Sequence, residues 1–432
     1  MTELARVVSR WEIVALSIND VIGSGVYVIL PVAAAALLGA ASIWAILGAG
    51  LAVLLLVLCF AEAGSQFDRA GGAYVYTREA FGELVGFEVG WMTWMARIST
   101  VASLVAYFAR TVGFFWPWAG EGAGRTVTGL VTLAVLTFVN VRGVKSGARA
   151  AVILTWGKLL PLGLFVGVGL FMVDRSRLVF ALPPPGNLGK AALLVLFAYA
   201  GFENTPALAG ELRDPRRDVP FALLAMITLV TALYTLVQIV AIGGIPDLGT
   251  STTPLASAAR TWLGPTGGLV LTVGAGLSVL GTLNNTVLIG PRYLYALAAD
   301  GALPAVFARL HPRYRTPWIA ILTQSGLASA LILTGTAEQL AELSVVARLA
   351  TYIGTAASVP VLRRKYPPDE RKAERALRLP GGPTIPIAAL AICLVFLSSA
   401  TPKNLVAGAL ALAVGAVVFF FRPASGIPPA HR

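Results

Sequence analysis

The sequence reads Ile22-Gly23-Ser24-Gly25 in the middle of a hydrophobic stretch that runs from residue 11 to residue 38. A second stretch, from residue 188 to residue 210, is interrupted by Gly201-Phe202-Glu203-Asn204-Thr205-Pro206. In a lipid bilayer, a helix loses backbone hydrogen bonds at mid-depth only where the freed groups face protein, water or a ligand. Paired interrupted helices are typical of the substrate sites of secondary transporters. The two interruptions therefore predict a membrane transport protein that binds its substrate between them.

Composition supports a membrane protein. Hydrophobic residues make up 57% of the 432 positions and charged residues 12%, against about 45–50% and about 25% in soluble domains. Because about 20 apolar residues cross a hydrocarbon core of about 30 Å, the sequence predicts an all-α polytopic membrane protein with twelve transmembrane helices. We expect these helices near residues 11–38, 42–66, 84–114, 126–141, 148–173, 188–210, 219–244, 266–299, 317–335, 338–362, 385–401 and 404–421.

The net charge of +12 is explained by membrane topology. Most Lys and Arg residues fall in the segments that face the cytoplasm when the N-terminus is placed inside. By the positive-inside rule, we expect both termini in the cytoplasm and the chain in the cytoplasmic membrane. The expected partners are therefore the lipid bilayer and a small-molecule substrate, and not nucleic acid.

No enzyme chemistry is predicted. Cys59 and Cys393 lie in hydrophobic stretches and are interpreted as small buried apolar residues. His311 and His431 fall in expected cytoplasmic segments, so we expect neither a metal site nor a cofactor. The first apolar stretch has no cleavage site after it and is expected to remain as the first span. The oligomeric state is not predicted.

The two interruptions offer complementary chemistry. Beyond Gly23, Ser24 and Gly25 a helix restarts, and its first amides can bind a carboxylate. The half-helix before Gly201 ends in carbonyls that suit an ammonium group, and Glu203 is an ionisable group at membrane depth. Together these groups would fit an α-amino acid. The alternative for the glycines is a close packing face between helices.

Three stretches carry a resemblance to a known family. They are Ile22-Gly23-Ser24-Gly25-Val26-Tyr27, Phe197-Ala198-Tyr199-Ala200-Gly201-Phe202-Glu203 followed by Glu211-Leu212-Arg213-Asp214-Pro215, and Tyr295-Ala296-Leu297-Ala298-Ala299-Asp300-Gly301. Through them the chain resembles the permeases of the amino acid–polyamine–organocation superfamily. The resemblance implies the leucine-transporter-type fold, with two inverted five-helix repeats (residues 11–173 and 188–362) followed by two extra helices (residues 385–421).

The resemblance also implies roles for single residues. The substrate carboxylate would bind the amides of residues 23–25, and the amine would bind carbonyls near Ile22 and in residues 197–202. Phe202 would act as a lid, and Glu203 matches a glutamate of the arginine/agmatine exchangers. The full set of expected substrate-binding residues is Ile22, Gly23, Ser24, Gly25, Ala96, Arg97, Phe197, Ala198, Phe202, Glu203, Asn204, Asn285 and Thr286.

Arg97 departs from the pattern of the family, in which this position is usually uncharged. Intramembrane charges usually pair, so one interpretation is an ion pair with Glu203 or Asp20. The other interpretation is that Arg97 selects an acidic or polar side chain of the substrate. Asp20 lies one turn before the first interruption, and its role is left open.

Lys158 is expected to couple transport to protons. In sodium-independent relatives, a lysine of the fifth span occupies the place of the sodium ion; the alternative is that Lys158 reaches the membrane interface. Sodium-coupled relatives also use hydroxyl residues of the eighth span, which correspond to Leu280-Gly281 here, with Ser278 and Thr282 only nearby. Both observations favour sodium independence.

The leading functional hypothesis is sodium-independent, proton-coupled secondary transport of amino acids. The alternatives are an amino acid/amine exchanger and a polyamine transporter. A polyamine needs no carboxylate site, so the Gly23-Ser24-Gly25 amides count against that alternative. The identity of the amino acid is not predicted.

Overall fold

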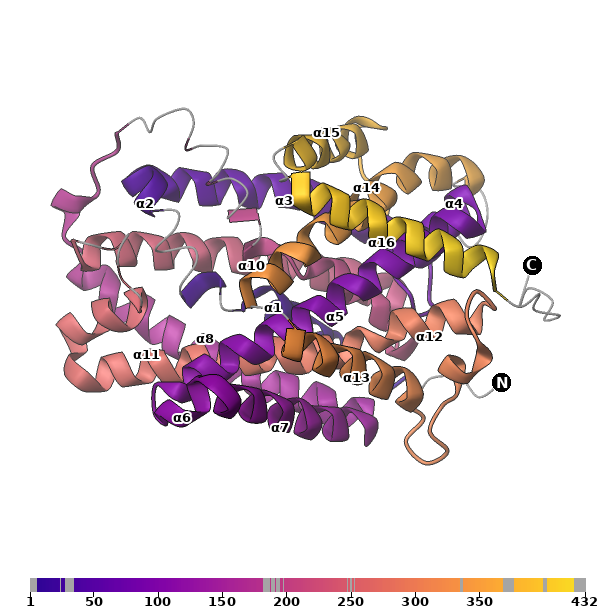
Figure 1. Cartoon of the computed structure of the whole chain (residues 1–432). Coiled ribbons are helices and arrows are strands. Elements are labelled where there is room, and N and C mark those ends of the chain that lie inside the picture. Colours follow the sequence, from indigo (N-terminus) through magenta and orange to yellow (C-terminus); the bar gives the residue numbers. More distant parts are fainter. Residues whose placement is uncertain are drawn as a thin grey trace.

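The computed structural model describes residues 6–23, 25–27, 35–181, 187, 191, 195–196, 198–246, 248, 251, 253–334, 337–367, 377–398 and 402–422. These residues form an elongated bundle of helices, and the two termini lie at the same end of it (Figure 1). The described residues include no β-strand and only one isolated backbone bridge, between Val8 and Leu212. An all-helical chain is thus confirmed.

The helices of the first half of the chain are α1 (Arg10–Val21), α2 (Ala35–Leu38), α3 (Ser42–Gly64), α4 (Ala73–Phe81), α5 (Glu83–Gly113), α6 (Pro117–Gly120), α7 (Gly122–Val141) and α8 (Val144–Met172). Those of the second half are the 3-10 helix η4 (Phe202–Glu211), α10 (Pro215–Gly244), α11 (Pro254–Ile289), α12 (Pro291–Ala299), α13 (Trp318–Thr334), α14 (Ala337–Lys365), α15 (Thr384–Ser398) and α16 (Pro402–Phe420). Most uninterrupted spans expected from the sequence coincide with a helix to within a few residues.

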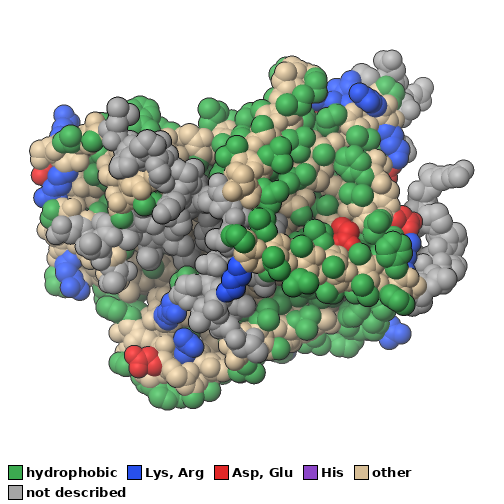
Figure 2. Space-filling view, turned by 45° about the horizontal axis from the view of Figure 1, so that its top comes forward, with side chains coloured by type: hydrophobic (Ala, Val, Ile, Leu, Met, Phe, Trp, Pro, Cys, Tyr) green, Lys and Arg blue, Asp and Glu red, His purple; other side chains and the backbone are tan. Residues whose placement is uncertain are grey.

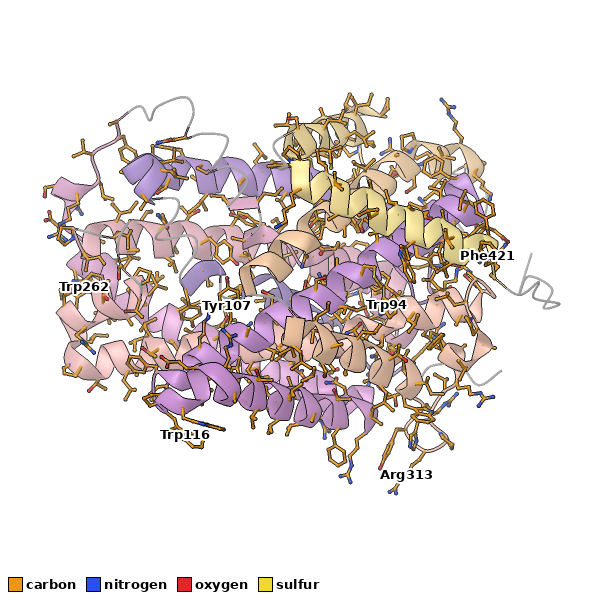
Figure 3. All side chains as sticks on the ribbon, viewed as in Figure 1. Trp94, Tyr107, Trp116, Trp262, Arg313 and Phe421 are labelled. Carbon is orange, nitrogen blue, oxygen red and sulfur yellow. The ribbon has the colours of Figure 1, made fainter. Side chains whose placement is uncertain are left out.

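The helices suit a bilayer in length and surface. Within the described residues, five segments are long and apolar enough to cross a membrane: Ala35–Gly64, Gly122–Val141, Gly147–Met172, Pro215–Gly244 and Pro254–Ala299. Figure 2 shows broad hydrophobic areas on the outer surface. Trp116 and Trp262 lie towards one end of the bundle and Arg313 and Phe421 towards the other (Figure 3), as is typical of the two interfaces of a membrane protein. The chain is therefore a multi-pass membrane protein, while the count of twelve spans and the inverted repeat stay predictions.

The first interruption follows a well-capped helix. The Ser9 hydroxyl accepts a hydrogen bond from the Glu12 amide, and the Glu12 carboxylate accepts one from the Ser9 amide (2.8 Å), which forms a capping box. Helix α1 ends at Val21, and Ile22 is extended, so the helix stops where the sequence indicated. Residues 25–27 form a short helical turn beyond it. Ser24 lies outside the described residues.

The second interruption is shorter than expected. The turn lies at residues 200–201, where Gly201 has φ +131°. The chain then continues as the 3-10 helix η4, which contains Pro206 in its interior. The expectation that the interruption extends over residues 201–206 was therefore wrong, because residues 202–206 are helical. Pro206 cannot donate to the Glu203 carbonyl, which accepts from the Tyr293 hydroxyl instead (3.2 Å). Phe197 lies outside the described residues.

A buried ion pair links the end of η4 to α12. Glu211 and Arg292 have fully buried side chains, and the Arg292 Nε lies 3.0 Å from Glu211 Oε1. Arg292 also donates to the Leu288 carbonyl. The Glu211 carbonyl accepts from the Val8 amide (3.0 Å). These contacts join the segment before the first interruption to the segment after the second.

Helix α4 packs across the end of the bundle that carries the termini. Arg78 Nη1 lies 2.6 Å from Asp300 Oδ2. Partial burial raises the pKa of Glu79, but hydrogen bonds from Lys365 and Tyr366 outweigh this effect and hold the pKa below its usual value. Charged contacts thus connect α4 to α12 and α14 at this end.

We predict that the Glu211–Arg292 pair behaves as one unit. Glu211→Gln and Arg292→Met should each cost about 3–5 kcal/mol of stability, because each leaves one uncompensated buried charge. The double variant should lose much less stability than the sum of the losses in the two single variants. Thermal unfolding of the purified protein measures this, and Arg217→Met, which removes an exposed pair with Asp214, is the control, with an effect of about 0–1 kcal/mol. Additive losses in the double variant would contradict the prediction.

Candidate functional site

The two interruptions touch each other. A Cβ atom added to Gly201 would lie 2.7 Å from the carbonyl oxygen of Asp20 and 3.1 Å from the amide nitrogen of Val21. A Cβ atom added to Gly25 would lie 3.3 Å from the Cβ atom of Ala198. Positive φ and close backbone contact both require glycine at position 201. The expected juxtaposition of the two interruptions is therefore present.

Side chains from neighbouring helices bind the carbonyls that the interruptions free. Tyr234 of α10 reaches the carbonyl oxygens of Val21 and Ala198, both at 3.1 Å. The Gly201 carbonyl accepts from the amide and the side chain of Asn204 (3.1 and 2.8 Å). These carbonyls, which the sequence assigned to a substrate amine, are thus bound within the protein in this conformation.

Four buried charged side chains meet beside the interruptions, and we call them the charge cluster: Asp20, Arg97, Glu203 and Arg348. Glu203 Oε1 accepts from Arg97 Nη2 (3.1 Å) and from Arg348 Nη1. Glu203 Oε2 accepts from the Gly201 amide (2.8 Å) and the Tyr352 hydroxyl (3.1 Å). Every strong acceptor position of this carboxylate therefore has a donor.

The same cluster confirms the ion-pair interpretation of Arg97. Besides Glu203, its guanidinium lies 3.5 Å from Asp20 Oδ2, which also accepts from Asn204 Nδ2 (2.7 Å). Sequence reasoning missed Arg348 as the second cation. A signal was present, because Arg348 is an arginine inside an expected span, and such a charge needs a partner.

Four polar atoms of the cluster region are buried without a hydrogen-bond partner among the described residues: Asp20 Oδ1, Asn204 Oδ1, Arg97 Nε and Arg348 Nε. Two of them accept and two donate hydrogen bonds. Buried polar atoms are usually paired, so these four are the groups that remain for a bound molecule or for water. No set of three or more His, Cys, Asp or Glu side chains that could hold a metal occurs in the described part of the chain.

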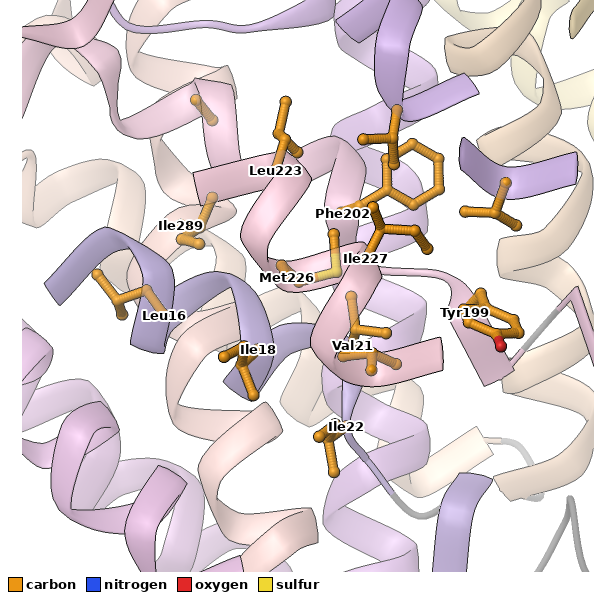
Figure 4. Close-up of a cluster of buried hydrophobic side chains, with 14 of the residues drawn as sticks. Leu16, Ile18, Val21, Ile22, Tyr199, Phe202, Leu223, Met226, Ile227 and Ile289 are labelled. Carbon is orange, nitrogen blue, oxygen red and sulfur yellow. The ribbon is translucent and has the colours of Figure 1, made fainter. Parts of the chain in front are cut away.

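Phe202 lies in an aromatic stack. Its ring stacks on Tyr352, with centroids 5.1 Å apart and planes 18° apart, and meets the edge of Phe60 at 5.4 Å. Figure 4 shows it in a hydrophobic cluster together with Met226 and Ile227 of α10. Phe202 is thus positioned directly before Glu203 and is held by two other rings.

Three residues expected at the site face other neighbours. Ala96 packs with Met92 and Ala347. Asn285 donates to the Leu16 carbonyl (3.0 Å), which lies in α1 before the interruption. Thr286 donates to the carbonyl of residue 282 in its own helix. The described contacts of these three side chains thus lie outside the two interruptions.

Lys158 of α8 binds the end of α1. Its buried ammonium donates to the carbonyls of Asn19 (3.0 Å) and Ile22, and lies 3.4 Å from the Thr282 hydroxyl. The alternative that Lys158 reaches the membrane interface is wrong, because the side chain is fully buried.

Two hydroxyl residues of α11 also bind the end of α1, although the aligned positions in the sequence are Leu280 and Gly281. Ser278 donates to the carbonyls of Ile22 and Gly23 (3.1 and 2.9 Å), and Thr282 lies 3.0 Å from the Asn19 carbonyl. Ser278 and Thr282, which lie only near the aligned positions in the sequence, thus reach the end of α1 in the structure. The lysine ammonium lies among the same oxygens.

Two helix interruptions that touch beside buried charges, in a bundle with an apolar exterior, are typical of a secondary membrane transporter. The chain matches the family model described as amino acid permease over residues 8–424. It therefore belongs to the amino acid permeases of the amino acid–polyamine–organocation superfamily, and it is a transporter rather than an enzyme.

Individual relatives match over nearly their full length. The chain is 31% identical over 414 residues to the serine/threonine exchanger SteT of Bacillus subtilis (strain 168), and the match covers 93% of this chain and 92% of that relative. It is 30% identical to the methylthioribose transporter of the same organism, and that match covers 96% of this chain and 93% of the relative. It is 28% identical to the branched-chain amino acid permease BcaP of Bacillus subtilis (strain 168), and that match also covers 96% of this chain and 93% of the relative.

We predict that Gly201→Ala disrupts both stability and transport. The positive φ costs about 1–3 kcal/mol for a residue with a side chain, and the added methyl group would also press against the backbone at Asp20. The matched control is Gly82→Ala, which has φ +92° but no atom within 4 Å of an added Cβ. Melting temperature and substrate uptake should both fall clearly more for Gly201→Ala. Equal losses in the two variants would show that the crossing contact is unimportant.

Proposed function

We propose that this protein carries out secondary active transport of amino acids, without sodium and coupled to protons. Membership in the amino acid permeases supports the general function of amino acid transport. The observation that carries the finer proposal is the Lys158 ammonium bound among the carbonyls of α1. We place the protein in the cytoplasmic membrane, with both termini in the cytoplasm.

The coupling step uses Lys158 as a removable link between α8 and α1. Protonated, it donates to the Asn19 and Ile22 carbonyls and holds the end of α1 against α8 and α11. Without the proton it loses the charge that makes these hydrogen bonds strong, and α1 is released. A proton would thereby bias two arrangements of one bundle, as alternating access requires.

The substrate would bind where the interruptions meet. The amides of residues 23–25 would hold its carboxylate, and the carbonyls near Ile22 and Ala198 would hold its amine after exchanging their present partners. Phe202 and Glu203 border this place. Ala96, Asn285 and Thr286 would take part only after a rearrangement, since their present contacts are elsewhere.

Exchange is the second candidate function. The relative with 31% identity is a serine/threonine exchanger, and an exchanger would use the same site without net proton movement. The two mechanisms differ in one measurement. Uptake into empty proteoliposomes supports proton coupling, whereas flux that needs substrate preloaded on the far side supports exchange.

We predict that uptake into proteoliposomes proceeds without sodium and rises as the external pH falls. Lys158→Ala should lower the initial rate of concentrative uptake by at least about tenfold. Lys403→Ala, which alters an exposed lysine of α16, is the control and should leave uptake unchanged. Full pH-dependent accumulation by Lys158→Ala, or loss of wild-type uptake on removal of sodium, would refute this mechanism.

We predict that Gly25→Val abolishes transport while the protein still inserts into the membrane. The Cβ atom of the added side chain would lie 3.3 Å from the Cβ atom of Ala198. The rest of the valine side chain would occupy the space next to the carboxylate site. The wild-type protein should also bind an amino acid much more tightly than the corresponding amine, because buried amides would otherwise stay unpaired. Equal thermal stabilisation by the two ligands would argue against the carboxylate site.

A further inference from the structure

We propose that the charge cluster restricts the substrates of this transporter to amino acids without net charge, and that Arg97 and Arg348 are the residues that exclude cationic substrates. This inference rests on the proposed transport function and adds the substrate class. It assigns specificity to Arg97, for which the sequence left an ion pair and a role in substrate selection both open, and to Arg348, which sequence reasoning did not consider.

The first argument is that Glu203 has no free acceptor position for a substrate. Two arginines share one of its oxygens, and an amide and a tyrosine hydroxyl share the other. A guanidinium or ammonium group of a substrate would have to displace one of these donors. Arg97 and Arg348 thus already supply, from within the protein, the positive charge that a cationic side chain would bring.

The second argument is charge balance. The cluster contains two cations and two anions, and the exposed fraction of each side chain is 10% or less. A substrate with a net charge would add one uncompensated charge to this buried region, which is strongly unfavourable. A zwitterion with an uncharged side chain adds none.

Two other charged groups lie near the cluster. Glu211 and Arg292 form a separate neutral pair. Lys158 binds carbonyl and hydroxyl oxygens close to Asp20. When it is protonated, its positive charge further disfavours a cationic substrate, and in the proposed cycle this charge arrives and leaves with the coupling proton, whatever the substrate is.

The third argument comes from the four atoms of the cluster region that have no hydrogen-bond partner among the residues that the structure describes. Asp20 Oδ1 and Asn204 Oδ1 can accept hydrogen bonds, and Arg97 Nε and Arg348 Nε can donate them. Equal numbers of open donors and acceptors match a zwitterion or a hydroxyl group. They do not match a polyamine, which only donates when it is protonated.

The experiment measures ligand binding by thermal shift and calorimetry on the purified full-length protein. The probes are alanine, serine and leucine as neutral ligands, arginine, agmatine and putrescine as cations, and glutamate as an anion. Wild-type protein should bind at least one neutral amino acid, and every charged probe at least about tenfold more weakly.

Variants test whether the cluster causes this preference. Arg97→Gln and Arg348→Gln leave the cluster with one excess negative charge, so the affinity for arginine or agmatine relative to the neutral ligand should rise at least about tenfold. Glu203→Gln leaves an excess positive charge and should shift the preference towards glutamate. The double variant Arg97→Gln/Glu203→Gln restores neutrality and should restore the neutral preference. Arg110→Gln, on α5 but outside the cluster, should keep the wild-type order.

The outcomes separate this inference from the proposed function. Binding of no amino acid by the wild-type protein would refute the proposed function itself. Tighter binding of a charged probe than of every neutral one by the wild-type protein would refute the charge rule while leaving amino acid transport in place. Folded single variants that weaken all ligands equally would refute the role of the two arginines.

Discussion

The backbone groups freed at Ile22 and Gly201 must find hydrogen-bond partners inside a lipid bilayer, and the surrounding helices are arranged to supply them. Tyr234 reaches both interruptions from α10, and Ser278 approaches the first one from α11. Lys158 adds an ammonium from α8. Because lipid offers no substitute for these donors, helices α8, α10 and α11 are held against the two interruptions.

A second constraint follows from the first. Four charged side chains lie beside the interruptions, and buried charges are tolerated only when they are balanced. Glu203 follows the second interruption directly and accepts hydrogen bonds from Arg97 of α5, from Arg348 of α14 and from the Gly201 amide. The cluster therefore joins helices from both halves of the chain at the place where a substrate is expected to bind.

The contacts of Lys158 and of the charge cluster differ in a way that suits different tasks. Lys158 is held only by neutral oxygens among its described contacts, so removing its proton leaves no unpaired carboxylate behind. Each arginine of the cluster instead faces a carboxylate and is expected to keep its charge throughout. Lys158 can thus gain and lose the coupling proton, while the charge cluster keeps a constant electrostatic environment.

The sequence by itself determined the membrane class, most helix boundaries and the positions of the two interruptions, because apolar length and glycine placement are local properties. It also indicated that Arg97 needs a carboxylate partner and that Lys158 lies near the first interruption. The tertiary structure alone decided that Arg348 is the second cation on Glu203, and that Ser278 and Thr282 face the end of α1. These choices depend on the rotation of each helix about its own axis. Packing against neighbouring helices sets that rotation, and in a span that is apolar nearly all round the sequence pattern contains little information about it.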